Sequence, residues 1–391
     1  MRSATLNIGF VPLVDCAPLV VAHEMGFAAD EGIAISLKRA PSWATARDAL
    51  SFGQVVAAHM LAPVPVAMAL GLGGGGVGAM DALSVLSVNG TLIGVSAELG
   101  ARMRDAGHSF DFADPVAAGR ALISAAPEPL RVGVPFPFSM HAELVFYWLS
   151  ALGHPSPQSL SIHTVPPPLM GDAIRAGEID AFCVGEPWGS KALESGVGQL
   201  LLPGNAIWAQ APEKVLAVRR DWAEAEPDLS SRLIRAVWHA GRWLDTPDGR
   251  SLAAEMLSRR EYLDVAPDQI ERALTGQIIV NSAGDVRSAP RFVGFHSFAA
   301  TFPWRSQAAW MGDRLAARTG LDRAQAMRAA SAVFRSDLYR AALANSSANL
   351  PTASSRVEGA LTEDALVAGT RREFLLPKNA FFDGKTFDPG F

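Results

Sequence analysis

Short apolar runs alternate with amphipathic stretches through the first half of the chain. The apolar run 5–11 is followed by a helix-patterned stretch, 19–31, a Gly stop at Gly32 and an alternating run, 33–37. Strand, helix and strand in this order predict a βαβ unit, and such units build parallel sheets. The opening of the chain therefore predicts an α/β fold.

The same alternation continues to about residue 218. Further strands are predicted at 55–60, 83–87, 92–95, 131–134, 161–165, 179–184 and 215–218. Further helices are predicted from Ser42, a suitable N-cap, and at 63–70, 114–125, 141–152 and 169–176. We expect the chain to cross to a second lobe near Ala97 and to return around 200–218.

Beyond residue 220 the pattern becomes helical, and the last residues are punctuated by Ser, Pro and Gly. Helices are predicted at 222–244, 249–260, 267–273, 307–318 and 323–344. We predict a two-lobed α/β clamshell that closes around a ligand. Its parts are the start of lobe 1 (1–97), lobe 2 (98–200), a return to lobe 1 with a helical region (201–345) and a surface tail (346–391).

Composition narrows the function classes. The chain has 391 residues, is 49% hydrophobic and carries a net charge of -5, so it suits two or three lobes and argues against direct nucleic-acid binding. The uncharged stretch 49–80 is long enough for a membrane span, but Pro63, Pro65 and its glycines interrupt it. We therefore predict no membrane partner. No secretory signal pattern precedes the first strand, which favours a cytoplasmic location.

Motifs of catalysis and cofactor binding are missing from the sequence. Cys16 and Cys183 stand alone in apolar surroundings and suggest buried free thiols. The glycine-rich segment 71–78 has no Gly-Lys-Ser/Thr, so it is not a phosphate-binding loop and reads as a connection. Neither a nucleophile elbow nor a zinc-protease helix is present. We expect a protein that is not an enzyme and has no metal or cofactor.

The stretch 180–188, Asp-Ala-Phe-Cys-Val-Gly-Glu-Pro-Trp, is the most informative one. Its apolar run predicts a buried strand, and Gly185, Glu186, Pro187 and Trp188 then predict a tight turn. In open α/β sheets, ligands lie beyond the carboxyl ends of the strands. We therefore predict that this turn forms one wall of a small-anion pocket.

Five residues at the ends of predicted elements could line that pocket: Trp43, Thr91, His141, Gly185 and Lys214. Each also has a purely structural interpretation: Trp43 in the core, Thr91 in a strand, His141 and Lys214 on the surface, Gly185 in a turn. Together they offer one cation, several N–H and O–H donors and an apolar wall. A buried charge-assisted hydrogen bond contributes about 1.5–3 kcal/mol, so two or three support roughly micromolar affinity.

Several stretches resemble the nitrate-binding proteins of the NrtA type over most of residues 5–345. They are 9–15 (Gly-Phe-Val-Pro-Leu-Val-Asp), 42–48 (Ser-Trp-Ala-Thr-Ala-Arg-Asp), 58–63, 89–90, 166–170, 180–188 and 212–214 (Pro-Glu-Lys). The resemblance implies a type II periplasmic-binding-protein fold, related to the bicarbonate-binding proteins of ABC transporters. It also implies a nitrate site made by Trp43, His141, Gly185 and Lys214.

The family has a Gln where this chain has Thr91, just after Asn89-Gly90. A Thr keeps a hydroxyl donor but is shorter, so nitrite becomes a candidate ligand beside nitrate. The resemblance is strongest to the cytoplasmic NasS-type sensor, which holds an RNA-binding antiterminator of the NasT type (an ANTAR protein) inactive until nitrate or nitrite binds. The alternatives are a transporter's substrate-binding protein for nitrate, nitrite or bicarbonate, and an enzyme of the kind that builds a thiamine pyrimidine.

Overall fold

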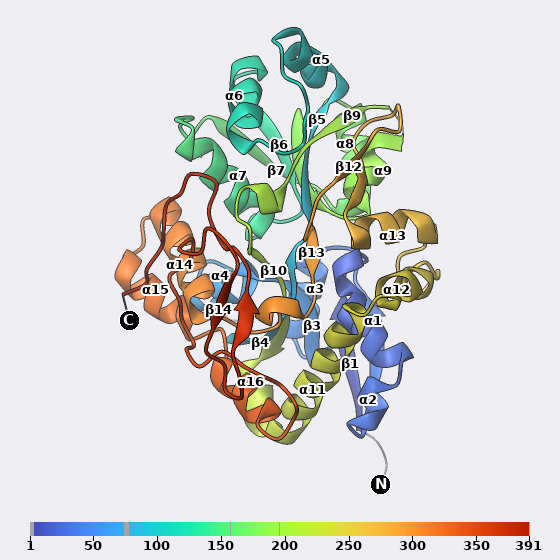
Figure 1. Cartoon of the computed structure of the whole chain (residues 1–391), viewed down its shortest axis with the longest axis vertical. Coiled ribbons are helices and arrows are strands. Elements are labelled where there is room, and N and C mark those ends of the chain that lie inside the picture. Colours follow the sequence, from blue (N-terminus) through green and yellow to red (C-terminus); the bar gives the residue numbers. More distant parts are fainter. Residues whose placement is uncertain (1–3, 74–77, 157, 195, 391) are drawn as a thin grey trace.

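Two lobes, each built on one β-sheet, make up the molecule (Figure 1). The structure, a computed structural model, describes residues 4–73, 78–156, 158–194 and 196–390. Four residues of the predicted glycine-rich connection, 74–77, lie outside the described part. In Figure 1 the lower lobe holds the N-terminus, and the upper lobe is formed by the teal and green middle of the chain.

The lower lobe contains a six-stranded mixed sheet. In spatial order its strands are β13 (Val293–Gly294), β4 (Met80–Asn89), β10 (Pro212–Arg219), β3 (Ala57–Leu61), β1 (Ala4–Phe10) and β2 (Ile33–Arg39). Strand β1 pairs in parallel with β2 and β3, which confirms the predicted βαβ start. Strand β10 runs antiparallel between β3 and β4. The return of the chain thus fills the centre of the sheet.

The upper lobe contains a five-stranded sheet. Its spatial order is β7 (Leu160–Thr164), β6 (Leu130–Val134), β8 (Ala181–Gly185), β5 (Thr91–Ser96) and β9 (Gly198–Pro203). Strands β6, β7 and β8 are parallel, and β5 is antiparallel to both its neighbours. The central strand β8 is buried along its length, as its continuous apolar sequence predicts.

Helices cover both sheets. Those of the upper lobe are α5 (Ala97–Asp105), α6 (Pro115–Ala125), α7 (Met140–Ala151), α8 (Met170–Arg175) and α9 (Trp188–Glu194). Those of the lower lobe are α1 (Ala17–Glu24), α2 (Phe27–Asp30), α3 (Trp43–Ser51), α4 (Pro63–Ala69), α10 (Arg220–Ala225), α11 (Pro227–Leu244), α12 (Gly249–Leu257), α13 (Pro267–Thr275), α14 (Arg305–Thr319), α15 (Arg323–Ser331) and α16 (Ser336–Leu343).

Several helices differ from the predicted ones. The predicted helix 19–31 is divided at Gly26, which adopts a left-handed φ of 79° between α1 and α2. The predicted helix 222–244 is divided before Pro227, since proline begins a helix more readily than it continues one. Helices α5 and α9 were not predicted; they have nine and seven residues and lie directly after predicted strands.

The chain passes between the sheets at Gly90, seven residues before the predicted Ala97, and again between β9 and β10. Asn89, at φ 61°, ties the two connections together. Its side-chain NH₂ donates to the Ala209 carbonyl at 2.9 Å, and its side-chain oxygen accepts from the Ala211 N–H at 3.0 Å. A later segment also reaches the upper lobe, where the Leu200 N–H donates to the Val280 carbonyl.

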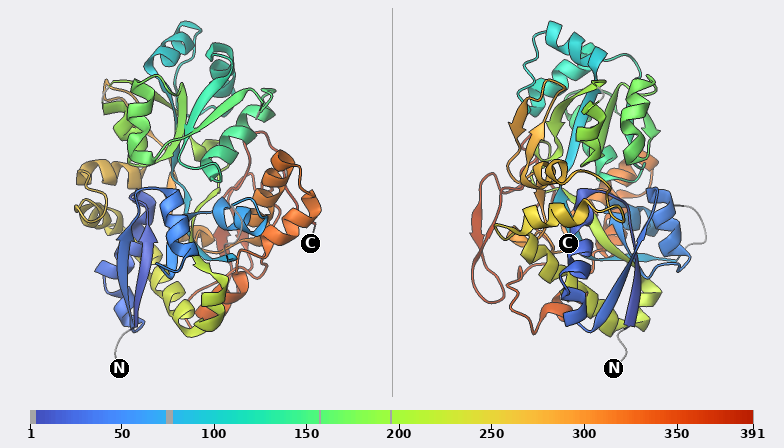
Figure 2. Two further views of the ribbon diagram at one scale, coloured as in Figure 1. Left: turned by 180° about the vertical axis from the view of Figure 1, so that it is seen from behind. Right: turned by 90° about the vertical axis from the view of Figure 1, so that its right-hand side faces the viewer.

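The C-terminal tail runs down one flank of the lower lobe, as the right-hand view of Figure 2 shows. It contains a small hairpin of β14 (Ala365–Val367) and β15 (Phe374–Leu376). Near its end, Phe381 packs against Trp310 of α14 and Tyr147 of α7. The tail therefore contacts both lobes.

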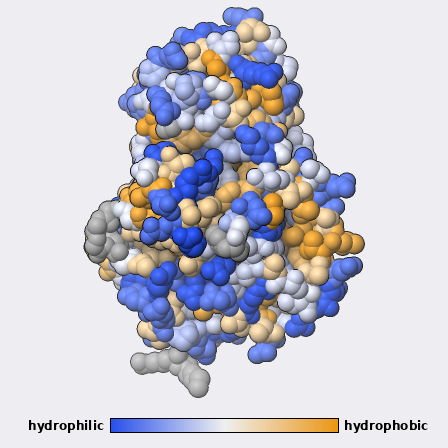
Figure 3. Space-filling view, turned by 90° about the vertical axis from the view of Figure 1, so that its left-hand side faces the viewer, coloured by the Kyte–Doolittle hydropathy of each residue, from blue (hydrophilic) through white to orange (hydrophobic). Residues whose placement is uncertain are grey.

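These features confirm the predicted two-lobed α/β architecture. On the face shown in Figure 3, hydrophilic and hydrophobic residues are interspersed, and a narrower upper lobe stands on a broader lower one. Among the described residues, none of the helices combines the length and apolarity that a membrane span needs. Cys16 and Cys183 are free and buried, as predicted.

Candidate functional site

A buried lysine lies at the centre of the contact between the lobes. The Lys214 ammonium donates to Asp15 Oδ2 at 2.7 Å and to Glu213 Oε1 at 2.9 Å. It also lies 5.3 Å from the centre of the Trp43 ring, within reach of a cation–π interaction. All four residues are at most 2% exposed. The surface interpretation of Lys214 is therefore wrong.

Local backbone features aim these side chains. Strand β10 has register shifts on both sides of Lys214, and such irregularities re-aim a side chain within a sheet. Asp15 lies in a 3-10 turn, Val14–Cys16, directly after β1. Ser42 caps α3, as predicted, by accepting the Thr45 N–H at 3.2 Å. The cap fixes the helix start at Trp43.

A histidine of β3 completes the lower-lobe side. His59 Nε2 lies 2.9 Å from Asp15 Oδ1, and its ring lies 5.3 Å from that of Trp43. Asp15 thereby receives His59 on one oxygen and Lys214 on the other. The carboxylate holds a cation and an imidazole in fixed positions beside one indole ring.

The upper lobe contributes His141 and Gly185. His141 lies in the first turn of α7, and Gly185 ends β8. A Cβ at Gly185 would lie 2.6 Å from Leu13 Cδ2, 3.8 Å from His141 Nε2 and 3.9 Å from Asp15 Oδ2. A side chain at this position would press on the Leu13 side chain, so glycine lets the loop after β1 approach the end of β8 closely.

Direct bonds hold the two sides together around this point. The Val14 N–H donates to the Glu186 carbonyl at 2.9 Å, and the Trp188 indole donates to the Pro12 carbonyl at 2.7 Å. The predicted turn 180–188 therefore forms one wall of a closed interlobe site.

Burial and charge set the protonation states. Burial alone would raise the pKa of Asp15, but Lys214 and His59 hold that pKa well below its usual range. Burial raises the pKa of Glu213 to about 7, against the attraction of Lys214. Burial would lower the pKa of Lys214, yet Asp15 and Glu213 raise it. Lys214 is thus charged, Asp15 is ionised and Glu213 titrates near neutrality.

The two histidines are neutral. Burial lowers the pKa of His59 despite its contact with Asp15. Burial, with Lys214, lowers the pKa of His141 well below its ordinary value. His141 Nδ1 lies 3.2 Å from Glu213 Oε1, although the angles do not make a hydrogen bond. Neutral imidazoles offer one donor and one acceptor each.

Several buried polar atoms around Lys214 have no hydrogen-bond partner among the described residues. They are Trp43 Nε1, His59 Nδ1, both ring nitrogens of His141 and Glu213 Oε2. Leaving such a group unpaired costs about 1–3 kcal/mol. Their concentration at one cation indicates a site for a small polar ligand.

Thr91 lies farther from the centre of the site than the other four predicted residues. It pairs with Gly185 across β5 and β8, so both residues face the same side of the sheet. Its hydroxyl is directed toward Gly204 and has no hydrogen-bond partner of good geometry, interacting only weakly with the Cys183 thiol. The structure brings Trp43, His141, Gly185 and Lys214 together and leaves Thr91 at the edge.

Sequence reasoning missed the roles of Asp15, His59 and Glu213. All three lie inside stretches that carry the family resemblance: Asp15 in the turn after β1, His59 within β3 and Glu213 at the start of β10. Their position was a usable signal, but a search for cations and donors passes over carboxylates. Among the described residues, no group of three or more His, Cys, Asp or Glu side chains is arranged to hold a metal ion.

Comparison with known proteins places the chain in a family. The sequence model of the NMT1-like family matches residues 1–258. The chain belongs to this family. Within it, the chain is 31% identical to a nitrate/nitrite binding protein NrtA of Nostoc sp. over 322 residues, which cover 79% of this chain and 70% of that one. It is a member of the NrtA-type group.

Longer relatives match over part of their length. The chain is 32% identical over 346 residues to a nitrate import ATP-binding protein NrtC of Synechococcus elongatus, covering 88% of this chain and 50% of that one. The chain therefore spans about half the length of this relative.

Solved structures agree with the fold of this NrtA-type chain. The crystal structure of the periplasmic nitrate-binding protein NrtA from Synechocystis superposes with a TM-score of 0.84 at 27% identity, covering 99% of this chain and 96% of that one. The alkanesulfonate-binding protein SsuA from Xanthomonas axonopodis pv. citri has a TM-score of 0.56 at 18% identity, covering 83% and 96%, which shows the fold alone. The chain has the periplasmic-binding-protein fold.

Proposed function

We propose that this NrtA-type protein binds nitrate or nitrite between its lobes and acts as a cytoplasmic sensor for an RNA-binding antiterminator of the NasT type. The observation that carries the anion proposal is the buried Lys214 ammonium, surrounded by the unpartnered Trp43 indole N–H and the unpartnered ring N–H of neutral His141. A planar oxyanion has the acceptors that these donors need.

Anion specificity is testable by calorimetry. Nitrate, nitrite, bicarbonate and chloride are titrated separately into the purified protein. We expect saturable heat from nitrate or nitrite, and loss of that heat in Lys214→Ala. The control is Lys38→Ala, an exposed lysine on β2 of the same sheet. If neither nitrate nor nitrite binds, the proposal is wrong.

The sensor role follows from the position of the site. The ligand would contact His141 and Gly185 of one lobe and Lys214 and Trp43 of the other, so its binding energy would depend on how the lobes are arranged. A partner that prefers one arrangement would then be released by the anion. In a pull-down, a co-expressed NasT-type protein should be retained without nitrate and lost on adding nitrate. Retention should be insensitive to nitrate in Lys214→Ala.

The second candidate is a substrate-binding protein of an ABC transporter for nitrate, nitrite or bicarbonate. Several relatives are named as import or transport proteins. One of them is a bicarbonate transport ATP-binding protein CmpC of Synechocystis, at 33% identity over 273 residues. Fractionation of cells separates the two roles, since a transport component is found outside the cytoplasmic membrane. Recovery there, with no effect of nitrate on the pull-down, would favour transport.

A further inference from the structure

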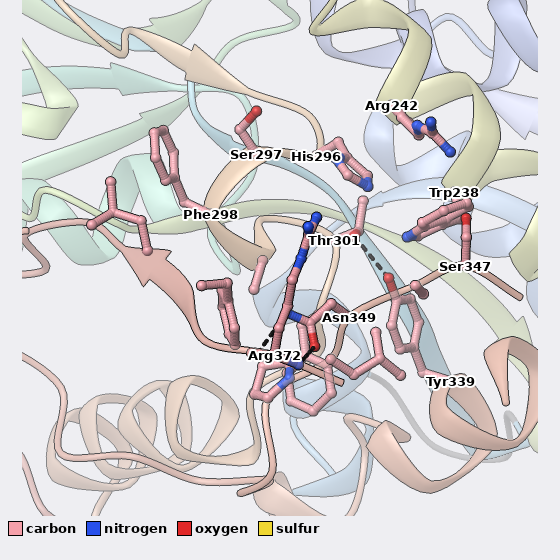
Figure 4. Close-up of a pocket in the computed structure, with 17 residues that line it drawn as sticks. Trp238, Arg242, His296, Ser297, Phe298, Thr301, Tyr339, Ser347, Asn349 and Arg372 are labelled. Atoms are coloured by element: carbon pink, nitrogen blue, oxygen red, sulfur yellow. Dashed lines mark hydrogen bonds between the residues drawn. The ribbon is translucent and has the colours of Figure 1, made fainter. Parts of the chain in front are cut away.

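A second cavity lies in the lower lobe, away from the interlobe site. It is bounded by α11, by the segment 296–302 and by the C-terminal tail (Figure 4). Its volume is about 500 Å³. Pockets for small organic molecules typically measure about 300–1,000 Å³. The cavity is therefore of a size for an organic molecule and far larger than a nitrate ion requires.

Two guanidinium groups give this cavity a positive charge. Arg242 extends from α11 and lies 5.8 Å from the centre of the Trp238 ring, and Arg372 reaches in from the tail. The backbone carbonyl of Arg372 accepts the Asn349 side-chain NH₂ at 2.8 Å, which fixes the base of that side chain. Among the described residues, no Asp or Glu lines the cavity and neither guanidinium has a carboxylate partner.

A buried indole faces the same space. Trp238 is 5% exposed, and its N–H donates to none of the described residues. Figure 4 shows this N–H directed into the cavity. The neighbouring hydroxyls of Thr301 and Tyr339, by contrast, are bonded to each other at 2.8 Å. The ring is thus buried while its N–H stays accessible at the cavity, where it can donate to a bound acceptor.

The remaining walls are aromatic or neutral. Phe298 and Phe374 provide apolar surface on the side of the tail. The His296 ring packs edge-on against Trp238 at 5.3 Å, and burial lowers its pKa. Asp245, the acid that acts on His296, is occupied by the Ser297 N–H and by Arg250. The charge offered to a ligand is thus that of the two arginines.

We propose that this cavity binds a small organic anion, a planar ring that carries a phosphate or carboxylate group. The anionic group lies between Arg242 and Arg372 and accepts the Trp238 N–H. The ring lies against Phe298 and Phe374. The site is independent of the interlobe anion site, so either can fail while the other stands.

Calorimetry with defined probes tests this site. AMP represents the phosphate class and benzoate the carboxylate class, and adenosine and inorganic phosphate supply ring and anion alone. We expect saturable binding of AMP or benzoate, at least tenfold tighter than adenosine or phosphate. The same probe should bind at least tenfold more weakly to Arg242→Gln/Arg372→Gln, and more weakly to Trp238→Phe, which keeps the aromatic surface.

Controls separate a lost site from a lost fold. The arginine variants should keep the thermal midpoint and the nitrate titration of the parent protein, and Arg120→Gln, an exposed arginine of α6, should change nothing. Absence of binding by both AMP and benzoate would overturn the proposal. Equal affinity for the parent and the double arginine variant would overturn it as well, and so would phosphate binding as tightly as AMP.

Discussion

Anion binding at Lys214 should be linked to a proton on Glu213. Lys214 is already paired with Asp15 and Glu213, so an anion entering beside ionised Glu213 would meet an excess of negative charge. The groups facing Glu213 are Lys214, His141, Asp15 and Cys183, and only Lys214 is positive. Neutral Glu213 removes the repulsion and supplies an O–H donor.

The magnitude follows from the pKa of Glu213, which burial raises to about 7. The bound anion raises this pKa further, so binding takes up a proton once the pH exceeds about 7. At pH 8 about ten molecules in eleven carry ionised Glu213. The affinity for the anion is therefore about 11-fold weaker, or about 1.4 kcal/mol, than at a pH where Glu213 is neutral. Below pH 6 the dependence should vanish, because Glu213 is then already neutral.

Calorimetry at pH 8 in HEPES and in Tris measures the proton directly, since the two buffers differ in ionisation enthalpy. We expect an uptake of about 0.9 proton per anion at pH 8 and about 0.1 at pH 6. Glu213→Gln should remove the uptake and flatten the pH profile. The matched control is Glu186→Gln, whose pKa burial also raises to about 7 but whose carboxylate binds Ser190. An affinity that stays flat from pH 6 to 9 would refute the linkage.

Three further substitutions test the site's construction. Lys214→Met leaves two buried carboxylates without their cation and should destabilise the fold by about 3–5 kcal/mol in urea unfolding; a loss below 1 kcal/mol would contradict that pairing. Gly185→Ala places a Cβ 2.6 Å from Leu13 Cδ2 and should cost about 1–3 kcal/mol, whereas Gly78→Ala meets no atom within 4 Å and serves as its control. Ser42→Ala removes the α3 cap and should lower stability by about 1 kcal/mol, and Ser42→Asp should restore it.

Local sequence patterns predicted most of the fold. The alternation of apolar strands and amphipathic helices predicted two α/β lobes, because the periodicity of apolar residues shows which face of each element is buried. The pattern could not show that the chain passes from the lower to the upper lobe at Gly90. In the sequence, β4 and β5 have the pattern of a hairpin, whereas in the structure they belong to different sheets. It also could not show that Asn89 would bind both connections.

The candidate site was predictable to a similar degree. Donors and a cation were found because they lie at strand and helix ends, where ligands bind. The carboxylates were not, because the role of Asp15 arises only when β10 is inserted between β3 and β4 and brings Lys214 to it. Burial and the neighbouring charges, which together set the pKa values at the site, are likewise properties of the assembled lobes.

The position of β10 also determines the order in which the two sheets can form during synthesis. All five strands of the upper sheet come from one stretch, 91–203, so that lobe can assemble as soon as this stretch has left the ribosome. The lower sheet begins earlier in the chain but lacks its central strand until residue 219 has been synthesised. The lobe that starts first is therefore finished second. Lys214 arrives with this central strand, so a nascent chain has no buried cation to offer an anion until the middle of the lower sheet is filled.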